Sequence, residues 1–458
     1  MKQVDFENGS IVHNIAQTAF PMLVAQMLSL LYSIVDRIYI GRIPGEGTSA
    51  LGAVGLCFPI IILITAFTNM YGMGGSPLFS MELGRGDKKK AEILMNTSFR
   101  LLCVTGVAIL VAGEVFARPL LQLFGASQGA MAYALPYLRI YLAGTLFSMI
   151  TTGMNPFINA QGFPGIGMMS VVIGAVSNLI LDPIFIFTLG LGVKGAAIAT
   201  VISQGFSMAL TGYYILSPRL ACRVRMPGKE NGKIWKYFPF AKDIMGLGTA
   251  PFIMQCTNSL VQIACNSVLM RFGGEIYVSV MTIVSSVRQI LDTPVGAIAE
   301  GASPIISYNY GAKKAGNVRK TIQIMTAIAG AYTLITWLFV RWRPELFISI
   351  FNTDEALLTD AVPALHLYFY AFIFQTFQYS GQTTFKALNK KNQAVFFSVF
   401  RKVVMVIPLT YLLPHLWGLG TDGVFMAEPV SNFVGGTACF ITMLLTVVPE
   451  LRSFEKIE

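Results

Sequence analysis

The stretch GSPLFSMELGRGDKKKA at residues 75–91 has a second copy, ASPIISYNYGAKKAGNV, at residues 302–318. The two copies are 227 positions apart, and the same offset aligns Phe124 with Phe351. A constant offset over so long a span indicates two copies of one architectural unit. When each unit is a set of membrane helices, the two copies usually form the two halves of a transport pathway.

The composition of the chain favours a membrane protein. Apolar residues make up 54% of the 458 residues and charged residues only 12%, whereas about a quarter of the residues in soluble domains are charged. Apolar runs of about 20 residues, enough to cross a bilayer core, recur along the whole chain. We therefore expect an all-α integral membrane protein with twelve transmembrane helices in two repeat-related six-helix bundles. The expected spans lie near residues 15–40, 50–82, 92–113, 133–157, 166–188, 193–215, 249–271, 279–307, 320–340, 361–385, 393–414 and 420–447.

The repeat also predicts the domain organisation. Six spans per copy is an even number, so both copies have the same orientation in the membrane. We expect an N-terminal six-helix bundle at residues 1–216, a cytoplasmic linker at 217–243 and a C-terminal six-helix bundle at 244–458.

Lysine and arginine predict the sidedness of the chain. With the N-terminus inside, the inside segments carry 21 of these residues and the outside loops only six. This bias favours cytoplasmic termini in a multi-pass protein of the cell membrane. The net charge of +10 is then an orientation signal, and we expect no nucleic-acid partner. The six outside residues are Arg42, Arg118, Lys194, Arg271, Arg341 and Arg343.

Signatures of enzymes and of cofactor sites are missing from the sequence. The six cysteines are scattered, which argues against a disulfide framework or a zinc site. No phosphate-binding loop and no paired-histidine metal motif occur. We expect a monomer without a cofactor, driven by an ion gradient, and not an enzyme.

Ionisable groups inside the expected spans are the first candidates for function, because they are costly there. Asp36 lies in the first span, and Asp182 lies in the fifth with Asn178 one helical turn earlier. Thr200 lies in the sixth span at the same depth as Asp182, since each is nine residues from the turn at Leu191. Two carboxylates, an amide and a hydroxyl suit a small hard cation, or a carboxyl that a like-charged neighbour keeps protonated.

Structural roles for these four residues stay open at this stage. Asp36 could be hydrated at the membrane interface, and Asp182 could satisfy backbone groups that the following Pro183 frees. Asn178 and Thr200 could form hydrogen bonds that only pack helices together. Coupling-ion chemistry is the interpretation we favour for the two acids.

Taken together, the two six-helix halves, the repeated motif at residues 75–91 and the pattern of acids resemble the MATE (multidrug and toxic compound extrusion) family. The nearest likeness is to its prokaryotic MepA-like and DinF-like branch. The resemblance covers essentially the whole chain. It implies a V-shaped pair of bundles and the efflux of organic cations in exchange for H⁺ or Na⁺. It further implies that Asp36 titrates or binds the ion, that Asn178, Asp182 and Thr200 complete the site, and that Pro21 lets the first helix bend.

The sequence departs from the pattern of another branch of that family, whose members carry acids in the seventh and tenth spans. Here neither residues 249–271 nor residues 361–385 contain an acid. The repeat partners of Asp36 and Asp182 fall near residues 263–266 and 407–410. We therefore expect the acidic site in the N-terminal half alone.

The C-terminal half has charges of its own in the eighth span. Arg288 and Asp292 are spaced for an internal salt bridge, and Glu300 lies two turns further on. Asp292 and Glu300 could instead contact a cationic substrate. Flexible and aromatic side chains suit an adaptable cavity. Candidates for its lining are Met70, Met73, Phe374 and Phe377.

These expectations combine into a mechanism of antiport by alternating access. Entry of an ion neutralises Asp36 and Asp182 and lowers the affinity for a small-molecule organic cation, which leaves outward or into membrane lipid. One rival function is a flippase for a lipid-linked precursor, which would line its cavity with several basic residues. The other is a membrane-embedded enzyme or receptor, for which no catalytic dyad or metal set is visible.

Overall fold

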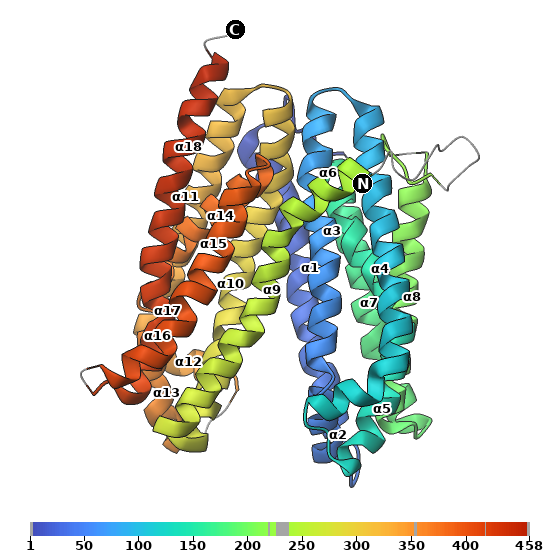
Figure 1. The fold of residues 1–458 in the computed structure, drawn as a ribbon, viewed down its shortest axis with the longest axis vertical. Helices are drawn as coiled ribbons and strands as arrows, with labels where there is room; N and C mark the ends of the chain where they lie inside the picture. The colour runs from blue at the N-terminus through green and yellow to red at the C-terminus, as the bar shows by residue number, and fades with distance from the viewer. Residues whose placement is uncertain (1–2, 219, 226–237, 352–354, 417, 456–458) are drawn as a thin grey trace. The chain divides into compact units, whose positions relative to one another are not determined.

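The computed structural model describes residues 3–218, 220–225, 238–351, 355–416 and 418–455, and all regular elements in these ranges are helices (Figure 1). The N-terminal repeat forms α1 (Ile11–Gly41), α2 (Gly47–Gly55), α3 (Phe58–Gly84), α4 (Lys88–Leu123), α5 (Gln128–Ala143), α6 (Thr145–Ala160), α7 (Pro164–Pro183), the π-helix η1 (Ile184–Thr188) and α8 (Gly192–Leu216).

The C-terminal repeat has more interruptions. It forms α9 (Phe238–Phe272), α10 (Gly274–Gly311), α11 (Ala315–Trp342), α12 (Pro344–Ser349), α13 (Glu355–Tyr368), η3 (Phe372–Phe374), α14 (Gln375–Ala387), α15 (Lys391–Val399), the π-helix η4 (Phe400–Val406), α16 (Ile407–Leu412), η5 (Leu413–His415), α17 (Gly420–Ser431), the π-helix η6 (Asn432–Gly436) and α18 (Thr437–Glu455).

The chain is an all-α membrane protein. In the described ranges eight helices are long and apolar enough to cross a membrane, or nine if the bent pair 357–368 and 372–387 counts as one span. Three of the twelve expected spans fall outside this set, for two physical reasons. The fourth is divided into α5 and α6, which have 16 residues each. The seventh and eighth, in α9 and α10, carry many polar side chains.

The backbone repeats along with the sequence. Left-handed backbone occurs at Gly86 (φ 79°) and at Lys313 (φ 59°), and again at Gly162 (φ 85°) and Asn389 (φ 57°). The members of each pair are 227 residues apart, the offset of the sequence repeat. Each pair marks the turn that ends one helix and lets the next begin, so the two copies share their turn geometry.

The chain divides into two compact units, each with its own apolar core. One unit contains residues 24–252, and the other contains residues 5–23 and 253–458. These bounds differ from the predicted bundles, 1–216 and 244–458, because α1 and α9 each change unit part of the way along. Of the predicted linker, residues 226–237 lie outside the described residues.

Close helix packing explains where the first half of α1 belongs. Thr18 Oγ1 donates a hydrogen bond of 2.9 Å to the carbonyl oxygen of Gly301 in α10. A Cβ atom on Gly301 would lie 2.8 Å from Ala19 Cα, so only glycine permits this contact. The first half of α9 packs in the same way on α3, where a Cβ on Gly248 would lie 1.9 Å from the carbonyl oxygen of Met70.

Candidate functional site

The two acids of the N-terminal half lie together in one unit. Asp36 comes from the second half of α1 and Asp182 from the end of α7, and their carboxyl groups lie close enough to interact. Asp182 is fully buried and Asp36 half-buried. Two carboxyl groups in contact repel each other unless a proton or a cation lies between them.

The local sequence explains how α7 and α8 bring their polar residues to this point. Pro183 follows Asp182 directly and lacks a backbone N–H, and the helix widens into η1 immediately afterwards. Gly190 (φ 65°) and Gly192 (φ 54°) then reverse the chain with left-handed backbone that glycine adopts without strain. The reversal returns α8 alongside α7, and Thr200 faces Asn178.

Asn178 links the acids to α8. Its Nδ2 donates to Asp182 Oδ1 at 3.0 Å and to Thr200 Oγ1 at 3.4 Å. Asn178 is only 2% exposed. The structure therefore brings together all four of the residues proposed for the coupling site.

Three oxygen atoms of this group are buried and have no hydrogen-bond partner among the described residues: Asp36 Oδ1, Asp182 Oδ2 and Asn178 Oδ1. Neither acid forms an ion pair with a basic side chain in the described ranges, and Arg37 lies over the ring of Phe58 instead, 4.6 Å from its centroid. Unpartnered buried oxygens are costly unless something occupies them. The group can hold a proton, or can offer oxygen ligands to a small hard cation.

A cavity of about 110 Å³, lined mainly by polar residues, reaches Asn178 and Thr200. It is large enough for several waters. Sequence reasoning missed most of its lining, although four polar residues of α8 follow the helical period and share one face. The polar groups that line it are Ser29, Tyr32, Ser148, Thr151, Thr152, Asn178, Thr200, Ser203, Gln204 and Ser207.

Several of these lining groups lack a partner of their own. Thr151 Oγ1, Ser203 Oγ and Gln204 Oε1 are buried without a hydrogen bond in the described part of the chain. A cavity with such a lining is polar enough and large enough to be hydrated. The cavity reaches Asn178 and Thr200, and Asn178 in turn contacts Asp182.

None of the other predicted residues lines this cavity. Pro21 is inside α1, two residues before the point where that helix changes unit. Met70 and Met73 are half-buried on α3. Phe374 and Phe377 contact each other at 5.7 Å between ring centroids, and they belong to the other unit.

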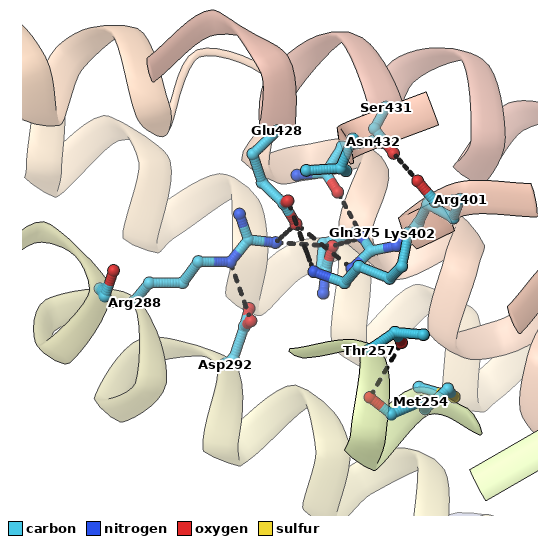
Figure 2. A network of polar contacts seen from close by, with 12 residues as sticks. Met254, Thr257, Arg288, Asp292, Gln375, Arg401, Lys402, Glu428, Ser431 and Asn432 are labelled. Carbon is cyan, nitrogen blue, oxygen red and sulfur yellow. Dashed lines mark hydrogen bonds and ion pairs between the residues drawn. The ribbon is translucent and has the colours of Figure 1, made fainter. Parts of the chain in front are cut away.

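The charges predicted for the eighth span form a larger network than expected (Figure 2). Arg288 Nε and Asp292 Oδ2 form the salt bridge, 3.1 Å apart. Arg288 also contacts Glu428 of α17, which sequence reasoning missed. The available signal was an in-span acid directly before a proline, the same pattern as Asp182 before Pro183. Glu300 is half-buried further along α10, within electrostatic reach of Lys386.

The repeat shows what replaces the acid pair in the C-terminal half. Asp36 and Asp182 correspond to Cys265 and Thr410, at local offsets of 229 and 228. These residues also meet, with Cys265 Sγ 3.8 Å from Thr410 Oγ1. A thiol and a hydroxyl therefore stand where the N-terminal unit has two carboxyl groups.

Known proteins resemble this chain over nearly its full length. The MatE family profile matches residues 21–184 and 251–412. The multidrug export protein MepA of Staphylococcus haemolyticus (strain JCSC1435) is 24% identical over 433 residues, which are 94% of this chain and 93% of that protein. MepA of Staphylococcus aureus (strain MRSA252) is 22% identical over 446 residues, 96% and 94% of the two chains.

Solved structures share the fold. One, described as the outward-facing conformation of a multidrug resistance MATE family transporter of the MOP superfamily, superposes with a TM-score of 0.90 at 24% identity. The match covers 100% of this chain and 99% of that one. The architecture is therefore that of the solved MATE transporters.

Proposed function

Because this chain belongs to the MatE family, and so is a multi-pass membrane transporter and not an enzyme, we propose that it is a multidrug exporter. Its cargo would be lipophilic organic cations, exchanged for H⁺ or Na⁺. The proposal locates it in the cell membrane with both termini in the cytoplasm. The relatives that carry the name multidrug export protein support the class of activity.

The contact between Asp36 and Asp182 is the observation that carries the proposal of ion coupling. The two carboxyl groups lie close together in a buried site, and each has an oxygen for which the described part of the chain supplies no partner. Their repulsion makes the contact depend on a bound proton or cation. Binding of the ion and the packing of the second half of α1 are then linked.

The mechanism that follows is alternating access. An ion that enters from outside neutralises the acid pair and favours the arrangement in which α1 packs against α7. Loss of the ion to the cytoplasm restores the repulsion and favours the other arrangement. A cation substrate that binds better when the acids are charged is released when the ion binds. The reason is that the ion and the substrate favour opposite arrangements of the same protein.

The decisive experiment is transport of a cationic dye by purified protein in liposomes, with Na⁺ and pH gradients imposed separately. One of the two gradients should drive dye transport in the wild type, and Asp36→Asn should abolish the driven component, because position 36 can then neither ionise nor repel the carboxylate of Asp182. Glu114→Gln is a matched control, since Glu114 lies outside the site in an exposed contact of 3.5 Å with Arg139. Gradient-driven transport by Asp36→Asn at the wild-type rate would refute the coupling.

A further inference from the structure

Five charged side chains of the C-terminal unit form one buried cluster (Figure 2). Glu428 is at its centre, with Arg288 Nη2 at 3.0 Å, Lys402 Nζ at 3.1 Å and Arg401 Nη2 at 3.3 Å from its Oε1 atom. Asp292 joins through Arg288. Three separate helical segments, α10, η4 and α17, thus supply the charges.

The π-helix η4 explains how two consecutive basic residues reach one carboxylate. Neighbours on an α-helix point roughly 100° apart, since 3.6 residues complete a turn. Arg401 and Lys402 nevertheless both contact Glu428, and both lie in η4, where the turn is wider. Such π segments occur frequently at functional sites.

The cluster contains an unbalanced charge. With Lys402 protonated, the cluster has three cations, Arg288, Arg401 and Lys402. Its two carboxylates, Glu428 and Asp292, then leave one positive charge without a counter-ion within the cluster. A buried charge without a partner is costly, and more so at membrane depth. The N-terminal unit has the opposite imbalance, because Asp36 and Asp182 form no ion pair in the described ranges.

Gln375 marks the place where the missing negative charge would fit. Its Oε1 accepts hydrogen bonds from Arg288 Nη2 at 3.2 Å and from Arg401 Nη1 at 2.9 Å. Two guanidinium groups, whose planar forks match carboxylates best, therefore converge on a neutral amide oxygen. Gln375 itself is 3% exposed.

A donor without a partner lies in the same cluster. Asn432 is fully buried, and its Oδ1 accepts a hydrogen bond from Arg401. Its Nδ2 is buried and has no acceptor in the described part of the chain. The cluster is not sealed, because the side chains of Asp292 and Lys402 are 19% and 14% exposed.

We propose that the cluster of Arg288, Gln375, Arg401, Lys402 and Glu428 is a binding site for a monovalent carboxylate, which replaces the amide oxygen of Gln375 between the two arginines. A single negative charge balances the cluster, whereas a pyrophosphate would exceed the surplus. The site shares no residue with the proposed coupling site. Failure of one proposal would therefore leave the other unaffected.

The test is a titration of the purified, detergent-solubilised protein with sodium benzoate, read as the midpoint of thermal unfolding at constant ionic strength. A ligand that binds only the folded state raises this midpoint with its concentration. We expect a rise that saturates in the wild type, and little response to sodium chloride. An equal saturating response to chloride, or no response to benzoate, would overturn the assignment.

A series of variants tests whether the rise of the unfolding midpoint with benzoate depends on the net charge of the cluster. Gln375→Glu builds a carboxylate into the site, and Lys402→Gln removes the surplus charge, so both should lose the response to benzoate. Asp292→Asn raises the surplus, so its apparent affinity should increase several-fold. Lys320→Gln is the matched control, because Lys320 is exposed on α11 and its loss should leave the response unchanged.

Two independent variants keep the proposal falsifiable if one of them fails to fold. Retention of a wild-type response by whichever of Gln375→Glu and Lys402→Gln is folded would overturn the site. Exchange of labelled benzoate across liposomes would then distinguish a transported carboxylate from a resident ligand.

Discussion

At the scale of the residue, one turn of the C-terminal copy has a less favourable residue than its partner in the N-terminal copy. Lys313 has left-handed backbone where its repeat partner, Gly86, is a glycine. Left-handed backbone costs a residue with a Cβ atom about 1–2 kcal/mol. Lys313→Gly should therefore stabilise the protein by about 1 kcal/mol, visible as a higher midpoint of thermal unfolding.

The neighbouring residue supplies the control for this prediction. Ala312 has an ordinary φ of −74°, so glycine there only increases the freedom of the unfolded chain. Ala312→Gly should lower the midpoint slightly. A lower midpoint for both variants would mean that the lysine side chain, and not its backbone, decides stability at this turn.

The residues of the acid pair could be predicted from the sequence, whereas Arg288 was the one residue of the carboxylate site that the sequence indicated. Asp182 and Thr200 flank one short turn, so counting residues from that turn placed them at equal depth. Glu428 contacts Arg288, Arg401 and Lys402 only because α10, η4 and α17 pack together. These segments are well separated in the sequence, so no local sequence pattern predicts the contacts. The offset of the repeat also drifts from 227 to 229 between loops, which blurs each correspondence by a residue or two.

At the scale of the element, α3 and α9 pack so closely that the contact has no room for a side chain at Gly248. A Cβ on Gly248 would lie 1.9 Å from a backbone oxygen, which cannot rotate aside. Gly248→Ala should therefore push the two helices apart and destabilise the protein by about 1–3 kcal/mol, the usual cost of overpacking. Thermal unfolding of the purified variant measures this directly.

A glycine in open space is the proper comparison for Gly248. Gly212 lies inside α8, and a Cβ there would meet nothing within 4 Å. Gly212→Ala should stabilise the helix by up to about 1 kcal/mol. Equal effects of the two substitutions would contradict the packing argument.

The division of α1 and α9 between units could not be predicted from composition. Each is one continuous helix, so no loop, charge run or glycine-rich linker marks the change. Both do contain a proline near it: Pro21 two residues before the boundary after Leu23, and Pro251 one residue before the boundary after Phe252. A proline removes one helical hydrogen bond, so each helix is weakest close to where its partners change.

At the scale of the whole molecule, the two copies have diverged in charge while keeping their backbone. The N-terminal unit holds two acids without a basic partner, and the C-terminal unit holds one surplus positive charge among five charged groups. Thr200 and Glu428 occupy corresponding positions, as do Asp182 and Thr410, so acid and hydroxyl have exchanged places between copies. A transporter whose two repeat-related sites carry opposite charge can bind a cation at one site and an anion at the other. Two identical sites could not make this distinction.

The orientation of the whole chain gives the last prediction. The excess of lysine and arginine in the expected inside segments, 21 against six, predicts that both termini are in the cytoplasm, by the positive-inside bias. Green fluorescent protein fused after Glu458 should then fluoresce, and alkaline phosphatase fused there should be inactive. Alkaline phosphatase fused after Arg343, in the expected outside loop between the ninth and tenth spans, should be active. The reverse pattern would mean that the charge bias does not orient this chain, and the direction proposed for ion entry and drug release would have to be exchanged with it.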